Sequence, residues 1–457
     1  MEMPRSLVVW FPFWSMLLIS LMTNDVLGNP SFTAMYVFGD SLVDNGNNNY
    51  LNSLAKANFE PYGIDFFEGP TGRFSNGKTL VDSLGEILGL PFLPSFADTV
   101  TGGKNISWGV NYASAAAGII DETGRNLGER ISFTQQVQNF KTTLSQLKIQ
   151  MEGTKLNQYL ANSLTIVIHG NNDYINNYLV PEMFTTSFIY DPKKYADVLI
   201  EDYKKQNMIL HGLGLRKFLL AGIGPLGCIP NQLAKGFAPP GECRTYVNDI
   251  VDMFNVLLKS LVEQLNGEHH GSIFVYGNTY DVFSELINEP AETYGFTVTD
   301  SGCCGMGRNQ GQITCLPGFN PCTNRNQYVF WDAFHPTEAV NKILAQRAFN
   351  GSPSDCYPVN VKQMAQMWLS SGESEELEED EEEVDEIEIG LAKSVSTKLV
   401  RSTGGKYGIE RRKGLRKPGG NIGGDNTGTG GGVGGHTNCT SGGNGKVSLM
   451  GTRMGIG

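Results

Sequence analysis

A serine near the beginning of the chain, Ser41, and a histidine much later, His335, are the residues that most clearly indicate catalysis in this sequence. Ser41 stands in the segment Gly-Asp-Ser-Leu (39–42), directly after a short apolar run, so a tight turn can present its hydroxyl to solvent. His335 follows Asp332 by three residues, and this spacing lets one short loop present a carboxylate to the imidazole. A serine activated by a histidine, with an aspartate to fix the histidine tautomer, is an arrangement that performs acyl transfer.

Each of these residues also has an ordinary structural interpretation. Ser41 or Asp332 could cap a helix, because serine and aspartate are common at helix N-termini. Among the six histidines, His169 lies at the end of an apolar run and competes with His335 as a general base. His211 ends a predicted helix, where the helix dipole favours a cation without any catalytic role. The chain has no Gly-x-Ser-x-Gly and no His-Glu-x-x-His segment, which disfavours an α/β-hydrolase and a zinc hydrolase.

Acyl transfer also requires hydrogen-bond donors for the oxyanion, and two further segments could supply them. Asn172 lies in Gly-Asn-Asn-Asp (170–173), which follows the apolar run 164–168, so its side-chain amide can reach the same cleft as Ser41. Residues 111–118 are mostly small, which allows backbone N–H groups to approach a substrate. Both segments could equally be turns, since asparagine and glycine are common turn residues.

The elements that must position these residues alternate along the chain. Short, almost continuous apolar runs predict buried strands, and segments with helical spacing of apolar residues lie between them. This alternation predicts one α/β domain, a three-layer α/β/α sandwich with a central parallel sheet, in which reactive groups lie at the carboxyl ends of strands. The predicted strands are 35–38, 164–168, 217–221 and 272–276, and the predicted helices are 80–88, 195–210, 247–265 and 337–349.

Several segments together resemble a known family. From about residue 34 to residue 366 the chain resembles the plant secreted GDSL esterase/lipases, which are part of the SGNH hydrolase superfamily. The resemblance is specific because all of the segments occur in the order that the family has. The segments are 38–48 (FGDSLVDNGNN), 72–77 (GRFSNG), 170–174 (GNNDY), 224–230 (GPLGCIP) and 330–337 (FWDAFHPT).

The resemblance implies an SGNH-hydrolase fold, which is flavodoxin-like, and an ester hydrolase that uses no cofactor and no metal. It makes Ser41 both the nucleophile and an oxyanion donor, with Asp332 and His335 as its partners in a catalytic triad. Asn172 is implied as a second oxyanion donor. Where the family often has glycine, this chain has Ala115, whose backbone N–H is expected to be a third donor. Alanine does not readily adopt the positive φ that glycine permits, so the donor in this loop stays open.

Composition and charge limit the expected partners. The formal net charge is −12, which disfavours a nucleic-acid partner, because phosphate binding requires clustered lysine and arginine. We expect a monomer without an integral membrane span that acts on an ester: a lipid, a cutin-like polyester or an acetylated polysaccharide. The alternatives are an acyltransferase on the same site and a secreted binding protein without turnover.

The two ends of the chain differ in composition from the part between them. Residues 1–28 combine one early arginine with an apolar run, which predicts a cleaved secretory signal and an extracellular protein, in the cell wall or apoplast if the source is a plant. A retained signal anchor is the alternative. Residues 29–370 are predicted to be the hydrolase domain. Residues 371–457, an acidic block followed by a basic, glycine-rich stretch, predict a disordered tail, with an interaction tail as the alternative.

Secretion determines how the eight cysteines are interpreted, because thiols pair in an oxidising compartment. Four cysteines lie close together in sequence, which predicts a loop closed by disulfides; a zinc site is the alternative, and the pairing cannot be read from the spacing. These four are Cys303, Cys304, Cys315 and Cys322. The predicted N-glycosylation sites are Asn105, Asn350 and Asn438.

Overall fold

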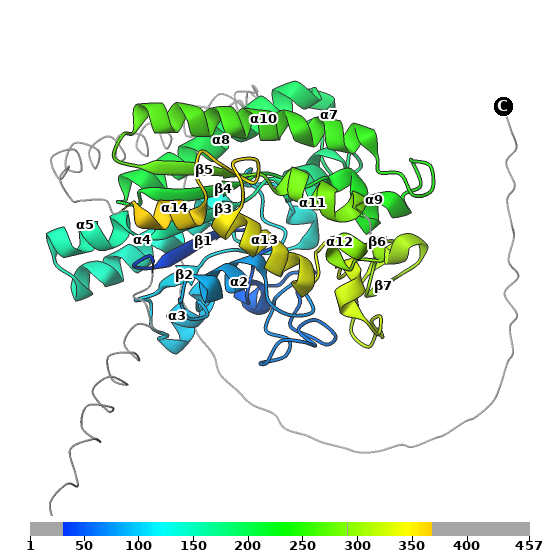
Figure 1. The fold of residues 1–457 in the computed structure, drawn as a ribbon, viewed down its shortest axis with the longest axis horizontal. Helices are drawn as coiled ribbons and strands as arrows, with labels where there is room; N and C mark the ends of the chain where they lie inside the picture. Colours follow the sequence, from blue (N-terminus) through cyan, green and yellow to red (C-terminus); the bar gives the residue numbers. More distant parts are fainter. Residues whose placement is uncertain (1–30, 290, 368–457) are drawn as a thin grey trace, which may run out of the picture. The chain divides into compact units, whose positions relative to one another are not determined.

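One mixed sheet organises the part of the chain that the structure describes. The structure is a computed structural model, and it describes residues 31–289 and 291–367. Within these residues, six strands form the sheet in the order β10-β5-β4-β3-β1-β2 (Figure 1). All neighbours pair in parallel except β10, which pairs antiparallel with β5 at the edge. The strands are β1 (Met35–Gly39), β2 (Gly109–Asn111), β3 (Leu164–Ile168), β4 (Lys217–Ala221), β5 (Ile273–Gly277) and β10 (Cys356–Tyr357).

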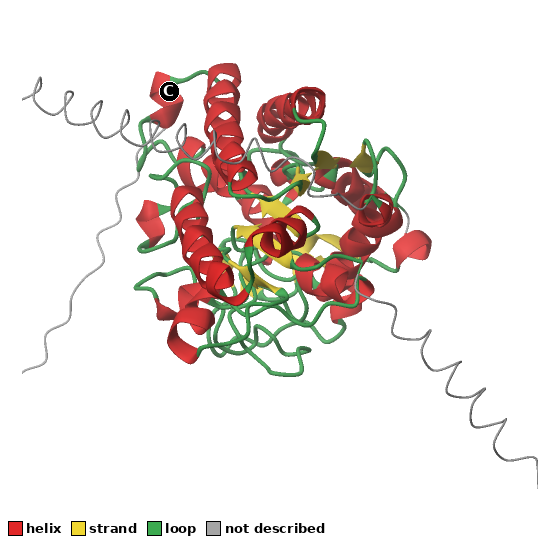
Figure 2. Cartoon of the chain, turned by 90° about the vertical axis from the view of Figure 1, so that its left-hand side faces the viewer, coloured by secondary structure: helices red, strands yellow, loops and turns green. Residues whose placement is uncertain are grey.

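Side chains of the central strands point alternately into two apolar layers, as expected for strands that are buried on both faces. In β1, Tyr36 and Phe38 lie in one layer, whereas Met35 and Val37 lie in the other. Every residue of β1, β3 and β4 is buried. The sheet therefore needs helices on both faces, and Figure 2 shows the strands, in yellow, lying between red helices on either side.

Three long helices cover the face to which Tyr36 belongs: α4 (Phe133–Gln150), α8 (Pro192–Gly212) and α10 (Thr245–Glu268). Their starting points follow from the sequence. The Ser132 side chain caps α4, and Asp191 caps α8 with a proline in its first turn, where the missing N–H does no harm. The buried residues of α10 recur every three or four positions, so one stripe of this helix faces the sheet.

The opposite face is covered by α2 (Leu80–Ile87), α13 (Glu338–Asn350) and α14 (Val361–Gln366). Helix α2 begins with a capping box formed by Thr79 and Asp82. The carboxylate of Asp82 also accepts two hydrogen bonds of 2.8 Å from the guanidinium of Arg73, and both side chains are buried. A bidentate pair of this kind fixes the geometry of the loop that leads into α2.

The remaining described elements lie in the connections and at the rim. Two small sheets stand apart from the central one, β6 (Val298–Gly302) with β9 (Tyr328–Phe330) and β7 (Gly305–Met306) with β8 (Ile313–Thr314). The other helices are α3 (Phe96–Gly102), α5 (Gly153–Ala161), α6 (Asn171–Asp173), α7 (Thr186–Ile189), α9 (Pro230–Ala234), α11 (Thr279–Asn288) and α12 (Ala291–Tyr294).

The cysteine cluster forms disulfides, as predicted. The four clustered sulfurs pair with one another, so they do not form a set of free thiolates for zinc. A further disulfide closes a loop that contains α9 and ends just before α10. Cys439 lies outside the described residues. The pairs are Cys303–Cys322, Cys304–Cys315 and Cys228–Cys243.

The order of the parallel strands determines where a crevice can form. Read from one edge, they run β2-β1-β3-β4-β5, which is the flavodoxin-like order. The chain leaves β1 toward one edge and returns to β3 on its other side, so the connections diverge at the carboxyl ends of these two strands. Ser41 follows β1 and Asn172 follows β3, which places both residues at this point.

The predicted three-layer α/β/α architecture is confirmed, with the correction that the sheet is mixed, because the short strand β10 runs antiparallel. The predicted strands 164–168 and 217–221 coincide with β3 and β4, whereas α8 and α10 are longer than predicted. The predicted signal (1–28) and tail (371–457) fall on residues that the structure does not describe, and the domain limits 29–370 stay a prediction. Across 31–367, residue 290 left aside, no helix has the length and apolar character needed to cross a membrane.

Candidate active site

Ser41, His335 and Asp332 lie in hydrogen-bond contact, although Ser41 is 294 residues from the histidine. The Oγ of Ser41 is 2.8 Å from Nε2 of His335. On the other side of the ring, Nδ1 is 2.9 Å from both carboxylate oxygens of Asp332. In this geometry the imidazole can take a proton from the hydroxyl, and the carboxylate can stabilise the resulting imidazolium.

The end of β1 determines the position of Ser41. A side chain at Gly39 would bring a Cβ to 2.6 Å from the Val43 side chain and 3.0 Å from the carbonyl oxygen of Ile168, so the close packing at the end of β1 favours glycine. The next residue, Asp40, is buried and accepts hydrogen bonds from the N–H of Leu42 and from the amide of Asn171. Asp40 therefore fastens the turn that carries Ser41 to the segment that follows β3.

Asp332 is fully buried and has several hydrogen-bond donors around it. The N–H groups of Phe334 and His335 both donate to its Oδ1 at 2.8 Å, so it also fixes the turn that carries the histidine. Burial alone would raise the pKa of Asp332. The neighbouring imidazole and the hydrogen bonds lower this pKa by a larger amount, so it lies below its ordinary value. The Asp332 carboxylate is therefore held in its charged form. The ring of Phe74 packs against the imidazole of His335.

Asn172 lies at the crevice with its amide in a fixed orientation. Its Nδ2 donates to the carbonyl oxygen of Ala117 at 3.0 Å, and its Oδ1 accepts from the amide of Asn176 at 2.6 Å. An amide nitrogen carries two hydrogens, so one of them is left for another acceptor. Asn172 lines the same pocket as Ser41 and His335, and this N–H is suited to binding an oxyanion there.

The loop after β2 contributes a different residue from the predicted one. The N–H of Ala115 donates to Oδ2 of Asp44 at 3.0 Å, so it is not free to bind an oxyanion. The loop residue that lines the pocket is Ala116, which has a φ of +67°. The expected donor Ala115 is therefore not available in this structure, because Asp44 takes up its N–H. Within the described residues, the N–H groups of Ala116 and Ser41 have no hydrogen-bond acceptor.

The pocket beside Ser41 has a volume of about 260 Å³ and a mostly apolar wall. One charged ammonium group also lines it, from Lys56, whose Nζ donates to the carbonyl oxygen of Asn49 at 3.2 Å. Part of the wall is the segment 314–317, which the Cys304–Cys315 disulfide ties to the end of β6. The apolar lining residues are Leu54, Phe59, Phe74, Leu127, Ile175, Leu316, Pro317 and Phe334.

The competing histidine, His169, and the helix-end histidine, His211, both have structural surroundings. His169 is buried, and its Nε2 lies 3.3 Å from the side-chain oxygen of Gln136. Burial lowers the pKa of His169 to about 3, so this ring is neutral. His211 bonds to the hydroxyl of Ser272, and burial lowers its pKa to about 3 as well. Burial, with the nearby charge of Arg216, therefore disfavours a cation at His211.

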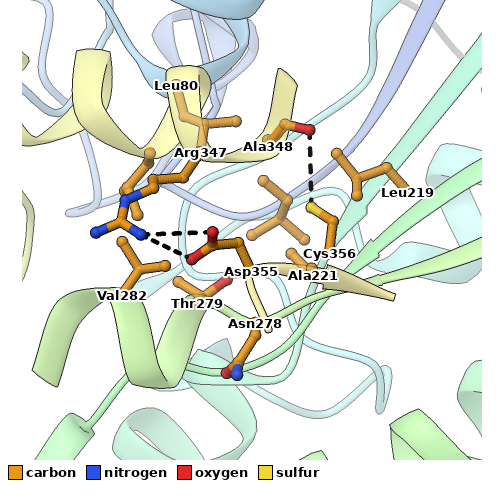
Figure 3. A pocket seen from close by; sticks show the side chains of 13 residues that line it. Leu80, Leu219, Ala221, Asn278, Thr279, Val282, Arg347, Ala348, Asp355 and Cys356 are labelled. Atoms are coloured by element: carbon orange, nitrogen blue, oxygen red, sulfur yellow. Dashed lines mark hydrogen bonds and ion pairs between the residues drawn. The ribbon is translucent and has the colours of Figure 1, made fainter. Parts of the chain in front are cut away.

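A free cysteine lines a second, much smaller cavity. This apolar cavity has a volume of about 40 Å³. Figure 3 shows the Cys356 thiol directed at the carbonyl of Ala348, and the ion pair formed by Arg347 and Asp355. Burial raises the pKa of Cys356 to about 12, so the thiol stays protonated and is a poor nucleophile.

One residue of the site carried no signal in the sequence. The hydroxyl of Tyr62 donates to Oδ2 of Asp332 at 2.5 Å, across 270 residues of sequence. Tyrosine is not part of the serine, histidine and aspartate pattern, and nothing in its neighbours' spacing indicates a contact with residue 332. Only the folded chain brings it to the triad.

Comparisons with known proteins show the family to which the chain is similar. Residues 35–348 match the family model described as GDSL-like Lipase/Acylhydrolase. The chain is 57% identical over 340 residues to the GDSL esterase/lipase At5g08460 of Arabidopsis thaliana, covering 74% of this chain and 88% of that relative. A second Arabidopsis protein, the GDSL esterase/lipase At1g71250, is 56% identical over 339 residues, covering 74% of this chain and 90% of the relative.

Proposed function

This chain belongs to the GDSL-like lipase/acylhydrolase family and is a carboxylic ester hydrolase, and on that premise we propose that it cleaves its substrate through an acyl-enzyme on Ser41. The single observation that supports this mechanism best is the contact of 2.8 Å between the hydroxyl of Ser41 and Nε2 of His335. His335 is the general base, and Asp332 orients it and balances its positive charge.

The reaction proceeds in two stages. Nε2 of His335 takes the proton from Ser41 as Oγ attacks the ester carbonyl, and the same nitrogen then gives the proton to the departing alkoxide. Water then gives a proton to the same imidazole as it attacks the acyl-enzyme. The bond between the acyl carbon and Oγ of Ser41 breaks, His335 returns the proton to Oγ, and the acid is released. In both stages the negative charge on the carbonyl oxygen is held by three donors: the N–H of Ser41, the N–H of Ala116 and the side-chain amide of Asn172.

The substrate is an ester with an aliphatic acyl chain. The pocket beside Ser41 is walled mainly by leucine, isoleucine and phenylalanine side chains, which gain from contact with methylene groups and gain little from an acetyl group. Among the substrate classes considered from the sequence, this wall favours lipids and cutin-like polyesters over acetylated polysaccharides. The Lys56 ammonium lies on the same wall and can contact a polar group of the alcohol portion.

The enzyme acts outside the cell. The apolar N-terminal segment supports secretion. The three disulfides among described residues agree with an oxidising compartment, where such bonds persist. The sequon residues Asn105 and Asn350 are both exposed, so both can carry glycans. The intact mass of the secreted protein measures signal removal and glycosylation together, and a protein that retained residues 1–28 would contradict this part of the proposal.

A serine-directed phosphonate probe tests the nucleophile directly. Ser41→Ala is expected to lose both turnover of nitrophenyl esters and covalent labelling, while its thermal midpoint stays close to that of the unchanged protein. Ser260→Ala is a matched control, because Ser260 is an exposed serine on α10 whose hydroxyl bonds only to the carbonyl of Val256. Labelling or full turnover in Ser41→Ala would refute the assignment.

A further inference from the structure

Tyr62 contacts the carboxylate of Asp332 from inside the protein. It is 2% exposed, and its ring packs edge-on against Phe59, Phe74 and Trp331. Burial, together with the negative charge of Asp332, raises the pKa of Tyr62 well above its ordinary value. The phenol therefore keeps its proton, and at 2.5 Å it donates that proton in a short hydrogen bond to Oδ2.

The two carboxylate oxygens of Asp332 accept hydrogen bonds from different donors. Oδ1 accepts from the N–H groups of Phe334 and His335, which belong to the same turn. Nδ1 of His335 lies 2.9 Å from each oxygen. Within the described residues, Tyr62 is the one donor to Oδ2 that comes from another part of the chain. Loss of its hydroxyl would leave one side of a buried carboxylate with the imidazole as its single partner.

We propose that Tyr62 is a positioning residue that acts through Asp332, fixing the carboxylate against His335 and limiting how strongly it attracts the protonated imidazole. The proposal rests on the ester hydrolysis proposed above. A hydrogen bond donated to a carboxylate draws negative charge away from the imidazole side. Without it, Asp332 stabilises the imidazolium more strongly and is also less firmly oriented, so His335 holds its proton to a higher pH.

Other ionisable groups face the same imidazole and must be separated from this effect. Asp40, at the end of β1, interacts electrostatically with His335, and burial raises the pKa of Asp40 to about 6, although hydrogen bonds oppose this. Lys56, from the segment before Tyr62, lines the pocket. Neither group contacts the Tyr62 hydroxyl, so changing that hydroxyl alone leaves both of them in place.

Tyr62→Phe removes the hydroxyl and keeps the ring that packs against Phe59, Phe74 and Trp331. We expect kcat to fall about tenfold with KM changed less than about twofold, the lower end of what a hydrogen bond to a charged group contributes. We expect the acid limb of the kcat/KM profile to move to higher pH by about half a unit, since this limb reports the free enzyme's base. An unmoved limb, or a loss confined to KM, would overturn the proposal.

Two further proteins make the test decisive. Replacing Tyr62 with 3-fluorotyrosine keeps the ring and hydroxyl but makes the phenol a stronger donor, so the acid limb should move to lower pH, opposite to the phenylalanine variant. This arm decides the question even if Tyr62→Phe fails to fold. Tyr112→Phe is the control, because it removes another buried hydroxyl, bonded to Thr143 at 2.7 Å, in the core and away from the triad. Its acid limb should not move.

The outcomes separate this proposal from the proposed function. Titration of Asp40 or Lys56 cannot produce shifts of opposite sign in the two Tyr62 proteins, because both groups are the same in each. Shifts in the same direction would therefore overturn the role of Tyr62. If Tyr62→Phe leaves the acid limb unchanged while Ser41→Ala still loses all turnover, the positioning role fails and ester hydrolysis on Ser41 stands.

Discussion

Replacement of Asn172 by alanine tests the oxyanion donors most directly, because neighbouring residues hold its amide in one orientation. One amide hydrogen goes to the carbonyl of Ala117 and the amide oxygen accepts from Asn176, which leaves one hydrogen for the pocket. The Asn172→Ala change removes that hydrogen and leaves the Ser41 and His335 contact in place.

The expected loss can be estimated from the bonds that are removed. Loss of one preorganised oxyanion donor lowers kcat by about 10²–10³, which corresponds to about 2.7–4 kcal/mol of transition-state stabilisation. The same change leaves the buried carbonyl of Ala117 without this donor, at about 1–3 kcal/mol of folding stability. A domain with about 5–15 kcal/mol of stability stays folded after such a loss, so activity and folding can be measured separately.

The assay compares kcat and KM on nitrophenyl butyrate with the thermal midpoint of each protein. Asn176→Ala is the matched variant, because it retains the Asn172 donor, releases the amide oxygen of Asn172 and changes one residue of the pocket wall. We expect a loss in kcat for Asn176→Ala of about tenfold, smaller than for Asn172→Ala. A folded Asn172→Ala protein with kcat within about fivefold of the unchanged enzyme would refute the donor role.

Two other predictions concern the loop before α2 and the pocket. Arg73→Met leaves the buried Asp82 carboxylate without its partner and should lower the free energy of unfolding by about 3–5 kcal/mol at pH 7. Burial alone raises the pKa of Asp82, but Arg73 and the hydrogen bonds lower it to below its ordinary value. The stability from the pair is therefore present above about pH 4 and is lost as the pH falls through the folded-state pKa. The gap in thermal midpoint between Arg73→Met and the unchanged protein should narrow toward pH 3, and a constant gap would contradict the assignment. Ile175→Trp fills part of the apolar pocket and should reduce kcat/KM for decanoate far more than for acetate, by about 0.8 kcal/mol for each methylene displaced; equal losses on both esters would show that the chain binds elsewhere.

The central strands could be predicted from the sequence because their signal is local. Strands β3 and β4 are almost continuous apolar runs, each followed closely by glycine, and the predicted and observed limits coincide. Strand β10 is two residues long and pairs antiparallel only because the chain returns to the edge beside β5. No run of two residues predicts such a strand. Helix α4 did carry a signal, since Ser132 caps it and its buried residues have helical spacing, but this segment was not predicted.

The sequence predicted the candidate site residues that can be recognised by their type and their order along the chain. The structure brings Ser41, Asp332 and His335 into contact, and Asn172 lies on the same pocket. The sequence could not separate Ala115 from Ala116 as the donor, because both residues are alanine. The path of the loop decides which of their two N–H groups faces the pocket. That choice depends on Asp44, whose carboxylate takes up the N–H of Ala115.

The disulfide-closed segment 303–322 contributes to the wall of the substrate pocket and contains none of the proposed reacting groups. Cys303 and Cys304 are neighbours, and their bonds to Cys322 and Cys315 form two nested rings that carry the 314–317 wall. None of these residues belongs to the central sheet, whereas Ser41 and Asn172 directly follow its strands. Substitutions at 314–317 can therefore reshape which substrates fit while Ser41 and Asn172 stay where the central sheet holds them. Enzyme engineering for a new chain-length preference has its natural starting point in this short stretch.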